Sequence, residues 1–497
     1  MKKIRVIAVL LLLGLGTAAA ETKPPNVVFI LADDLGWSDT TLYGTTRYFE
    51  TPHIQALADS GVLLSQAYTA SPVCTPTRAS IMTGQWPARY GLTQARGHLE
   101  EVRLQAVPVN EESPARTTLE LITATRLPTE GVTTLADFLK SHGYHTAHFG
   151  KWHLGHEPYS PLEHGFEIDV PHSGNGFGDN YLAPWGNPDL EGLEHGPGDH
   201  IEDVMAREAA AFIKEQAGKG QPFFLNYWAF SIHSPWYAKE EYADYFREKR
   251  DPMDPQSNPV YAAMVRSFDD AVGVLLKALD EAGIRDNTLI VFTSDNGGNT
   301  FGPAASKTGP DYGADIPGTN SYPLRAGKGS LYEGGVRVPT VFSWAGSLEA
   351  GSANDAQFNS VDYVPPIAGL LGLPMPDKLA IDGVNQAEVL KGGPAVRHEQ
   401  FYYYPHYSGS GAPAAAVRQG DWKLVRFFHG NVDQSHREEL YNLHNDIAER
   451  QNVAGRFKDK HQALSRLLDD YLDQAGAVLP LPNPAWPKQD MTALKWR

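Results

Sequence analysis

The sequence predicts an α/β fold with a smaller α+β region near the C-terminus. Apolar runs rich in β-branched residues carry the first part of this prediction, since such runs are typical of strands buried on both faces of a parallel sheet. They occupy residues 26–32, 222–230 and 288–294. Amphipathic patterns of helical period alternate with them, at residues 133–140, 201–216 and 260–283. Beyond about residue 395 the pattern changes to short alternating strands, which predicts a separate small sheet.

Shorter elements complete the chain. Thr51 is a predicted helix N-cap with Pro52 at the first helical position, and this helix should end at Gly61. Further strands are expected at residues 62–70, 146–149 and 338–344. The C-terminal region should contain a hairpin over 417–427, a strand over 439–443 and a helix over 457–473. We therefore expect a main domain at residues 21–394 and a C-terminal subdomain with a small antiparallel sheet at residues 395–497.

The first twenty residues have the pattern of a signal peptide. Lys2, Lys3 and Arg5 precede a short apolar run, and small residues follow it at Ala18–Ala20. The run is shorter than a membrane-spanning helix requires, and no other run is long enough. We expect cleavage after residue 20, a periplasmic or secreted protein, and no membrane anchor. The net charge of −17 argues against nonspecific nucleic-acid binding.

The single cysteine, Cys74, stands in a distinctive stretch from Ser71 to Gly84. A lone thiol in an exported protein cannot form an internal disulfide and calls for another explanation. Pro76 suits the first turn of a helix that Arg78 then opens. Cys74 would lie at the positive N-terminal end of that helix, where an anion or a polarised oxygen is favoured. The alternative is a buried free cysteine that packs as a small hydrophobe.

Two predicted strands end in paired polar residues. Asp33 and Asp34 follow the strand at 26–32, and Asp295 and Asn296 follow the strand at 288–294. Ligands of open α/β sheets bind beyond the carboxyl ends of strands, and adjacent carboxylates there repel unless a cation lies between them. These oxygens suit Ca²⁺, with Mg²⁺ as a substitute. The alternative interpretation is an Asx turn or helix cap for the first pair and a hairpin turn for the second.

Cationic and imidazole side chains occur in three further loops. Lys151 and His153 lie in a glycine-flanked string after the strand at 146–149, and would share one side if the strand continued. His233 follows the strand at 222–230, and Lys328 stands between two glycines that let the backbone pass close to a ligand. Taken singly, a solvated turn or a satisfied structural histidine explains each.

The run from Cys74 to Gly84 resembles the signature of the type I sulfatases. The other motifs follow in the order of that family and span nearly the whole mature chain: Asp33-Asp34, Lys151-x-His153, His233, Asp295-Asn296 and Lys328. The resemblance implies the alkaline-phosphatase-like fold, with a central, mostly parallel sheet flanked by helices and a C-terminal domain that contains a small antiparallel sheet. It makes residues 21–394 the catalytic domain.

The resemblance also implies a chemistry, the hydrolysis of sulfate esters. Cys74 would be converted by a formylglycine-generating maturation enzyme to Cα-formylglycine (3-oxoalanine), whose hydrate attacks sulfur. One Ca²⁺ would be held by Asp33, Asp34, Asp295, Asn296 and an oxygen of the modified Cys74. The implied catalytic residues are Arg78, which orients the hydrate, Lys151 and Lys328, which bind sulfate oxygens, His153, a base, and His233, a proton donor to the leaving group. The substrate would be a sulfated carbohydrate or an aryl sulfate.

Three other functions stay open. A hydrolase of phosphomonoesters, phosphodiesters or phosphonates would have the same fold and a different substrate. The paired ligands, however, are enough for one metal ion rather than two. A thiol hydrolase would use Cys74 with His153 or His233. A glycan-binding protein without activity would retain the fold alone.

Long segments at residues 92–131 and 164–200 lack periodicity and are expected to be surface loops. The first could form a rim of the active site, and both could line substrate subsites. His172, Asn175 and His200 are candidates for sugar contacts, with ordinary loop polarity as the alternative for each.

Overall fold

The structure is a computed structural model that describes residues 23–108, 116–174, 180–300, 317–376, 379–396 and 399–486. The expected signal peptide at residues 1–20 and the candidate sugar contact Asn175 lie outside the described residues. Within them, no helix is both long enough and apolar enough to span a bilayer.

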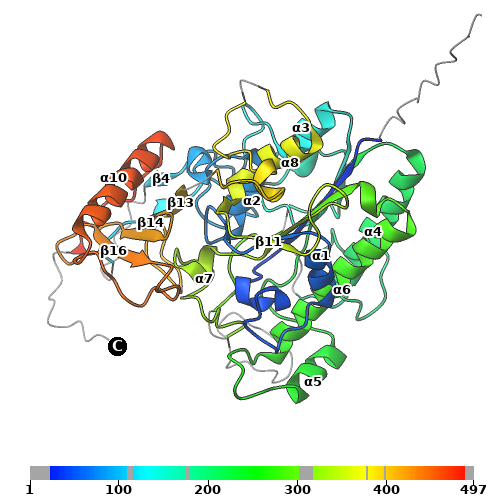
Figure 1. The fold of residues 1–497 in the computed structure, drawn as a ribbon, viewed down its shortest axis with the longest axis horizontal. Coiled ribbons are helices and arrows are strands. Elements are labelled where there is room, and N and C mark those ends of the chain that lie inside the picture. Colours follow the sequence, from blue (N-terminus) through cyan, green and yellow to red (C-terminus); the bar gives the residue numbers. More distant parts are fainter. Residues whose placement is uncertain are drawn as a thin grey trace, which may run out of the picture.

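A mostly parallel sheet forms the centre of the described chain, as predicted (Figure 1). Its eight described strands run in the order β11-β2-β10-β9-β1-β8-β6-β7, and only β10 runs antiparallel to its neighbours. Their bounds are β1 (Asn26–Ala32), β2 (Val62–Leu64), β6 (His145–Gly150), β7 (Ile168–Val170), β8 (Phe223–Trp228), β9 (Thr288–Ser294), β10 (Thr340–Ser343) and β11 (Ser352–Asn354). The strongly apolar strands β1, β8 and β9 occupy the middle of the sheet.

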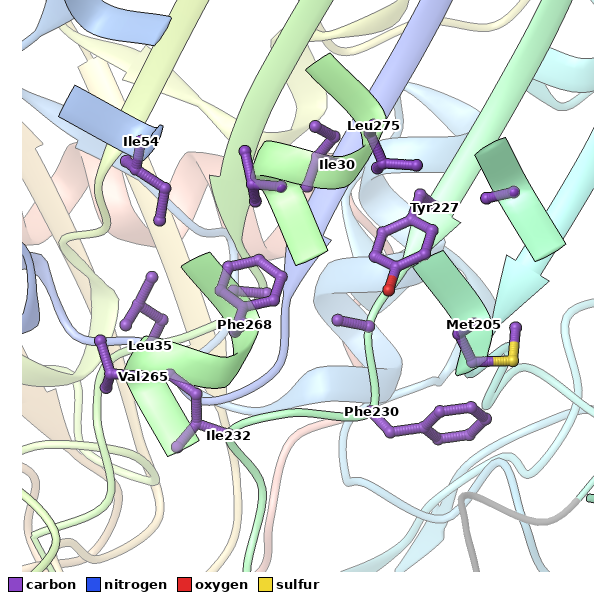
Figure 2. Close-up of a cluster of buried hydrophobic side chains, with 14 of the residues drawn as sticks. Ile30, Leu35, Ile54, Met205, Tyr227, Phe230, Ile232, Val265, Phe268 and Leu275 are labelled. Carbon is purple, nitrogen blue, oxygen red and sulfur yellow. The ribbon is translucent and has the colours of Figure 1, made fainter. Parts of the chain in front are cut away.

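Helices cover both faces of this sheet, and the alternation of side chains along β1 shows why. Val28 and Ile30 pack toward one helical layer, and Val27 and Phe29 pack toward the other. The first layer contains α1 (Pro52–Asp59), α4 (Ile201–Lys219), α5 (Glu240–Glu248) and α6 (Pro259–Glu281). The second contains α2 (Cys74–Thr83), α3 (Leu135–Ser141), α8 (Val364–Leu371) and α9 (Ala387–Leu390). Figure 2 shows the first layer, where Ile30 and Tyr227 of the sheet meet Phe268 and Leu275 of α6.

A separate antiparallel sheet lies near the C-terminus, as expected (Figure 1). It contains β13 (Glu399–Tyr404), β14 (Ala414–Gln419), β15 (Trp422–Phe427) and β16 (Arg437–Asn442), and α10 (Lys458–Gln474) packs against it. The opposite face contacts α7 (Glu333–Val336) and the segment before Cys74. The boundary between residues 394 and 395 stays a prediction.

Two expectations about local structure are wrong. Residues 62–70 do not form one strand, because a turn at Ser65 and Gln66 separates β2 from β3 (Ala67–Tyr68). β3 leaves the main sheet and pairs with β12 (Phe358–Asn359). The helix after Cys74 also begins earlier than expected, at Cys74 itself, so that Arg78 lies in its second turn rather than opening it.

The segment at residues 92–131 is more than a surface excursion. Its short strands β4 (Val107–Pro108) and β5 (Leu121–Ile122) form a hairpin, and Thr118 pairs with Pro482 of the C-terminal segment. Leu92, Arg126 and Leu127 of this segment are buried. The segment is therefore anchored against both parts of the molecule.

Candidate active site

The paired polar residues meet at the carboxyl edge of the sheet. β1 and β9 are parallel neighbours in register, with Ala32 opposite Ser294, so the residues that follow them emerge side by side. The Asp34 backbone N–H donates to Asp295 Oδ1 at 3.1 Å, and Asn296 Nδ2 donates to Asp34 Oδ1 at 2.8 Å. Asp34 has a φ of 68°, a left-handed conformation that this hydrogen bonding holds in place.

The thiol of Cys74 lies close to these oxygens. It is fully buried at the first position of α2. Sγ of Cys74 and carboxylate oxygens of Asp33 and Asp295 all lie within 4.8 Å of one another. Asp33 Oδ1 and Asn296 Oδ1 are buried and have no hydrogen-bond partner in the described part of the chain. Buried oxygens without donors are costly, so these atoms fit a bound cation.

Three cationic side chains surround the carboxylates. Lys151 Nζ lies 2.5 Å from Asp33 Oδ2 and 3.9 Å from Cys74 Sγ. Arg78 Nε donates to Asp295 Oδ2 at 2.9 Å, and its Nη1 donates to the carbonyl of Lys151 at 2.5 Å. Arg78 is fully buried, and its guanidinium also lies 5.1 Å from the ring centroid of Trp228. These contacts bring together side chains from segments that lie far apart in the sequence.

Lys328 completes the ring from a glycine-rich loop. Its Nζ lies 2.7 Å from Asp34 Oδ1, while its backbone N–H donates to the carbonyl of Gly298 at 3.0 Å. A Cβ atom at Gly327 would lie 2.5 Å from that same carbonyl oxygen, so only glycine lets the two loops approach. The sequence predicts that the glycines let the backbone pass close to a ligand, but the close approach that the structure shows at Gly327 is to the loop of Gly298.

The two histidines lie beside this cluster. His233 Nε2 is 4.0 Å from Asp34 Oδ2, and its Nδ1 lies 2.5 Å from the carbonyl of Ser234. His153 is buried, and its Nε2 lies 2.9 Å from Nδ1 of His98. The expectation that Lys151 and His153 share one side of a strand is wrong, because β6 ends at Gly150 and His153 has a φ of 60°.

The pKa values of Asp295 and Asp33, the two carboxyl groups grouped with Cys74, shift in opposite directions. Burial raises the pKa of Asp295 to about 7, and the negative charge of Asp33 adds to this increase. Burial alone would also raise the pKa of Asp33, but Lys151, His233 and Arg78 hold it well below its usual range. A cation among these groups would lower the pKa of Asp295. The electrostatics of the site therefore favour the binding of a further positive charge.

The remaining groups have pKa shifts with clear causes. Burial raises the pKa of the Cys74 thiol, which keeps the thiol protonated at neutral pH. Burial would lower the pKa of Lys328, but Asp34 and other negative neighbours, among them Asp33, together outweigh burial and raise it, so Lys328 is a cation. Burial and the charge of Lys328 lower the pKa of His233 to about 4. Burial, together with Lys151 and His98, lowers the pKa of His153 well below its usual range.

The two candidate sugar contacts within the described residues have different surroundings. His200 is buried and caps α4 by accepting a hydrogen bond from the Glu202 backbone, so it is a structural residue. His172 is exposed and contacts Asp169 at 2.8 Å. His98 is not among the site residues that the sequence predicts, and its contact with His153 joins residues 55 positions apart.

Comparison with known proteins agrees with the fold and the site. Residues 25–373 match the sulfatase family, and residues 327–476 match the family described as N-sulphoglucosamine sulphohydrolase, C-terminal. The chain is 31% identical to N-acetylgalactosamine-6-sulfatase of Canis lupus familiaris over 468 residues, which cover 91% of this chain and 80% of the relative. It is 29% identical to arylsulfatase A of Homo sapiens over 509 residues, which cover 92% and 89% of the two chains.

A solved structure of similar fold is that of Ps i-CgsB in complex with k-i-k-neocarrahexaose. It aligns with a TM-score of 0.70 at 29% identity and covers 90% of this chain and 92% of that chain. Fold, site and relatives define a hydrolase of sulfate esters. The chain belongs to the sulfatase family, and its relatives place it among the type I sulfatases, which confirms the resemblance inferred from the sequence.

Proposed function

We propose that this sulfatase removes sulfate from a sulfated carbohydrate, with Cys74 converted to Cα-formylglycine and one Ca²⁺ bound beside it. The observation that carries the proposal is the position of Cys74, which lies within reach of Asp33 and Asp295 and of the cation Lys151. A cysteine buried only for packing would not require this concentration of charge.

The metal would be held by Asp33, Asp34, Asp295 and Asn296, together with an oxygen of the modified Cys74. Asp33 Oδ1 and Asn296 Oδ1, which accept no hydrogen bond from any described residue, support this ligand set. When bound, Ca²⁺ would polarise a sulfate oxygen and stabilise the ionised nucleophile, and Mg²⁺ could replace it. Formylglycine hydrate would supply one hydroxyl for attack on sulfur and a second whose deprotonation releases sulfate.

The cationic residues would bind and orient the sulfate group. Lys151 and Lys328 reach the site from opposite loops, and each would contact sulfonyl oxygens as negative charge develops on them. Arg78 is held by Asp295 and by the carbonyl of Lys151, so it would fix the position of residue 74 and offset its charge. The two lysines would have to exchange part of their contacts with Asp33 and Asp34 for the metal and the substrate.

The two histidines would move protons. His153 would act as the base that deprotonates the second hydroxyl. His233 donates through Nδ1–H to the carbonyl of Ser234, because a carbonyl can only accept. In the neutral form of His233, Nε2 therefore carries no proton. A bound sulfate anion would raise the pKa of His233 from about 4, and the protonated ring could then donate from Nε2 to the leaving oxygen.

The substrate class rests on the relatives. One relative is named N-acetylgalactosamine-6-sulfatase, and the structure of Ps i-CgsB contains k-i-k-neocarrahexaose. We infer that this chain also takes a sulfated sugar, that a maturation enzyme oxidises Cys74, and that the signal peptide exports the protein to the periplasm or beyond.

Hydrolysis of phosphate esters is the main alternative within this fold. The acidic clusters at the sheet edge share Asp33, which favours one cation and therefore the less charged sulfate ester. A thiol hydrolase is disfavoured because burial raises the pKa of Cys74 and so suppresses the thiolate. A binding protein without activity would not need Lys151, Lys328 and His153 around one thiol.

The test compares kcat/KM of the purified enzyme on 4-nitrophenyl sulfate and 4-nitrophenyl phosphate, followed by sulfate release from defined sulfated oligosaccharides. We expect a preference for the sulfate ester and faster turnover of at least one sulfated sugar. A preference for phosphate by orders of magnitude would overturn the choice of ester. Turnover of aryl sulfate without release from any sugar would overturn the substrate class.

A further inference from the structure

His98 lies against the proposed base of the reaction. His98 Nδ1 and His153 Nε2 are 2.9 Å apart, a hydrogen-bond distance, and the two rings are tilted by 31° with centroids 5.1 Å apart. The other ring nitrogen of His153, Nδ1, is buried and has no hydrogen-bond partner among the residues described. One nitrogen of the base is thus engaged by His98, and the other is free of hydrogen bonds within the described part of the chain.

The segment that carries His98 is built onto the backbone of His153. A Cβ atom at Gly97 would lie 1.8 Å from the carbonyl oxygen of His153, so this position requires glycine. Thr75, the neighbour of Cys74, donates from its hydroxyl to that carbonyl at 3.0 Å and accepts from the Gly97 N–H at 3.2 Å. His153 is therefore clamped between the helix of Cys74 and the His98 segment.

Two further side chains hold this segment in place. The buried guanidinium of Arg126 donates to the carbonyls of Leu99, at 2.5 Å, and Glu100, at 3.1 Å. His156 donates from Nε2 to the carbonyl of His98 at 2.7 Å. Buried hydrogen bonds of this kind fix the position of a loop. The contact between the two imidazoles is therefore held in place by the surrounding structure.

Only one hydrogen can lie between two ring nitrogens at this distance, so either His153 Nε2–H donates to His98 Nδ1 or the reverse, and the tautomers of the two rings are coupled. Among the charges that act on His153, Lys151 comes first, followed by His98 and Arg78. Positive charge around the ring favours a lone pair over an N–H on the buried Nδ1, and therefore the tautomer with its hydrogen on Nε2.

We propose that His98 is a positioning residue that accepts a hydrogen bond from His153 Nε2–H and thereby keeps His153 Nδ1 unprotonated in the resting enzyme. The inference rests on the proposed role of His153 as base. The hydroxyl proton of modified residue 74 would pass to Nδ1, the O–H electrons would form the C=O bond, and the C–O bond to sulfate would break with its electrons leaving on sulfate. With the opposite tautomer, Nδ1 could not accept the proton.

A direct test measures the tautomer without turnover. Full-length protein labelled with ¹⁵N-histidine is compared by long-range ¹H–¹⁵N correlation with the His98→Leu and His98→Asn variants, and His153→Ala assigns the signal. In the wild-type protein we expect His153 to carry its hydrogen on Nε2. The asparagine side chain of His98→Asn offers an amide oxygen as acceptor and should keep this state, whereas the leucine should release it. An Nδ1–H tautomer in the wild-type protein would overturn the proposal, as would a leucine variant with an unchanged tautomer.

Kinetics of the matured enzyme give the second readout. We expect His98→Leu to lower kcat by on the order of 10²-fold with little change in KM, because the base would have the wrong tautomer. His98→Asn should restore most of kcat, and His444→Leu, which removes an exposed histidine, serves as the control. Equal loss in the asparagine and leucine variants, at unchanged melting temperature, would contradict tautomer control. If His153→Ala is itself fully active, the proposed role of His153 as base is wrong. The NMR result would still show whether His98 sets the tautomer of His153.

Discussion

Lys328 Nζ contacts both carboxylate oxygens of Asp34, at 2.7 and 2.8 Å, although 294 positions separate the two residues. Asp34 emerges from the end of β1, and Lys328 is carried by a loop that the carbonyl of Gly298 holds in place. The pair therefore links the proposed metal ligands to the group that would bind sulfate.

Replacing Lys328 by methionine should lower kcat/KM for sulfate esters by about 10²- to 10³-fold, because a preorganised cation near the developing charge is lost. Lys277→Met is the matched control, since Lys277 is 74% exposed and pairs with Glu281 on the surface of α6. Steady-state kinetics on both variants check this. Equal activity of the two would show that Lys328 does not contact the substrate.

The mass of the peptide around residue 74 should reveal the modification. Conversion of the thiol to an aldehyde lowers the peptide mass by about 18 Da relative to the unmodified sequence. Cys74→Ala should keep its fold, because alanine fits a site where the thiol is already buried, and should lose turnover by orders of magnitude. Unchanged turnover in this variant would refute both the nucleophile and its modification.

Removal of the metal should destabilise the protein as well as inactivate it. Without a cation, Asp33 and Asp295 share a buried site with two oxygens, Asp33 Oδ1 and Asn296 Oδ1, that have no hydrogen-bond partner among the residues the structure describes. A ligand at 100 times its Kd stabilises a folded protein by about 2.7 kcal/mol. We expect chelation to lower the melting temperature and activity, and Ca²⁺ to restore both. A melting temperature independent of Ca²⁺ would argue against the site.

A buried charge cluster between α7 and the C-terminal sheet should make stability depend on pH. Lys423 Nζ lies 2.9 Å from Glu333 Oε1 and 3.0 Å from Glu449 Oε1, with all three side chains fully buried. Burial, together with the charge of Glu333, raises the pKa of Glu449 from 4.5 to about 7. Burial alone would raise the pKa of Glu333 too, but Lys423 and Arg418 lower it to about 2.

Because the folded pKa of Glu449 is raised, its contribution to the free energy of unfolding is full below the unfolded value and is lost as pH rises through about 7. Glu333 acts in the opposite direction, but only below pH 4.5, outside this window. Glu449→Gln should therefore gain stability relative to wild type between about pH 5 and about pH 8, by on the order of 1–3 kcal/mol. Urea denaturation of both proteins at the two pH values measures this gain in the free energy of unfolding. A difference between variant and wild type that does not change with pH would contradict the raised pKa of Glu449.

Much of the site could be predicted because it depends on strand ends. Asp33 and Asn296 follow strands with unmistakable apolar runs, and parallel strands bring their carboxyl ends to one edge of a sheet. The position of Cys74 at a helix N-terminus followed from Pro76, although the exact first residue did not.

The rest depends on contacts that leave no periodic signal. His98 lies in a segment without helical or strand pattern, and its partner His153 adopts a left-handed conformation just beyond β6. His200 was a candidate for sugar contact, but its role as a helix cap emerges only when the preceding loop is folded. Residues 62–70 contain enough apolar side chains for one strand, and only the turn at Ser65 divides them between two sheets.

The complete burial of Cys74 bears on the timing of the oxidation proposed for it. In the folded protein the thiol is 0% exposed and is enclosed by α2, the end of β9 and the loop of Lys151. An enzyme active site could not reach the sulfur without dismantling that enclosure. Any catalyst that oxidises Cys74 must therefore meet the nascent or unfolded polypeptide, and chains that fold first would remain permanently unactivated.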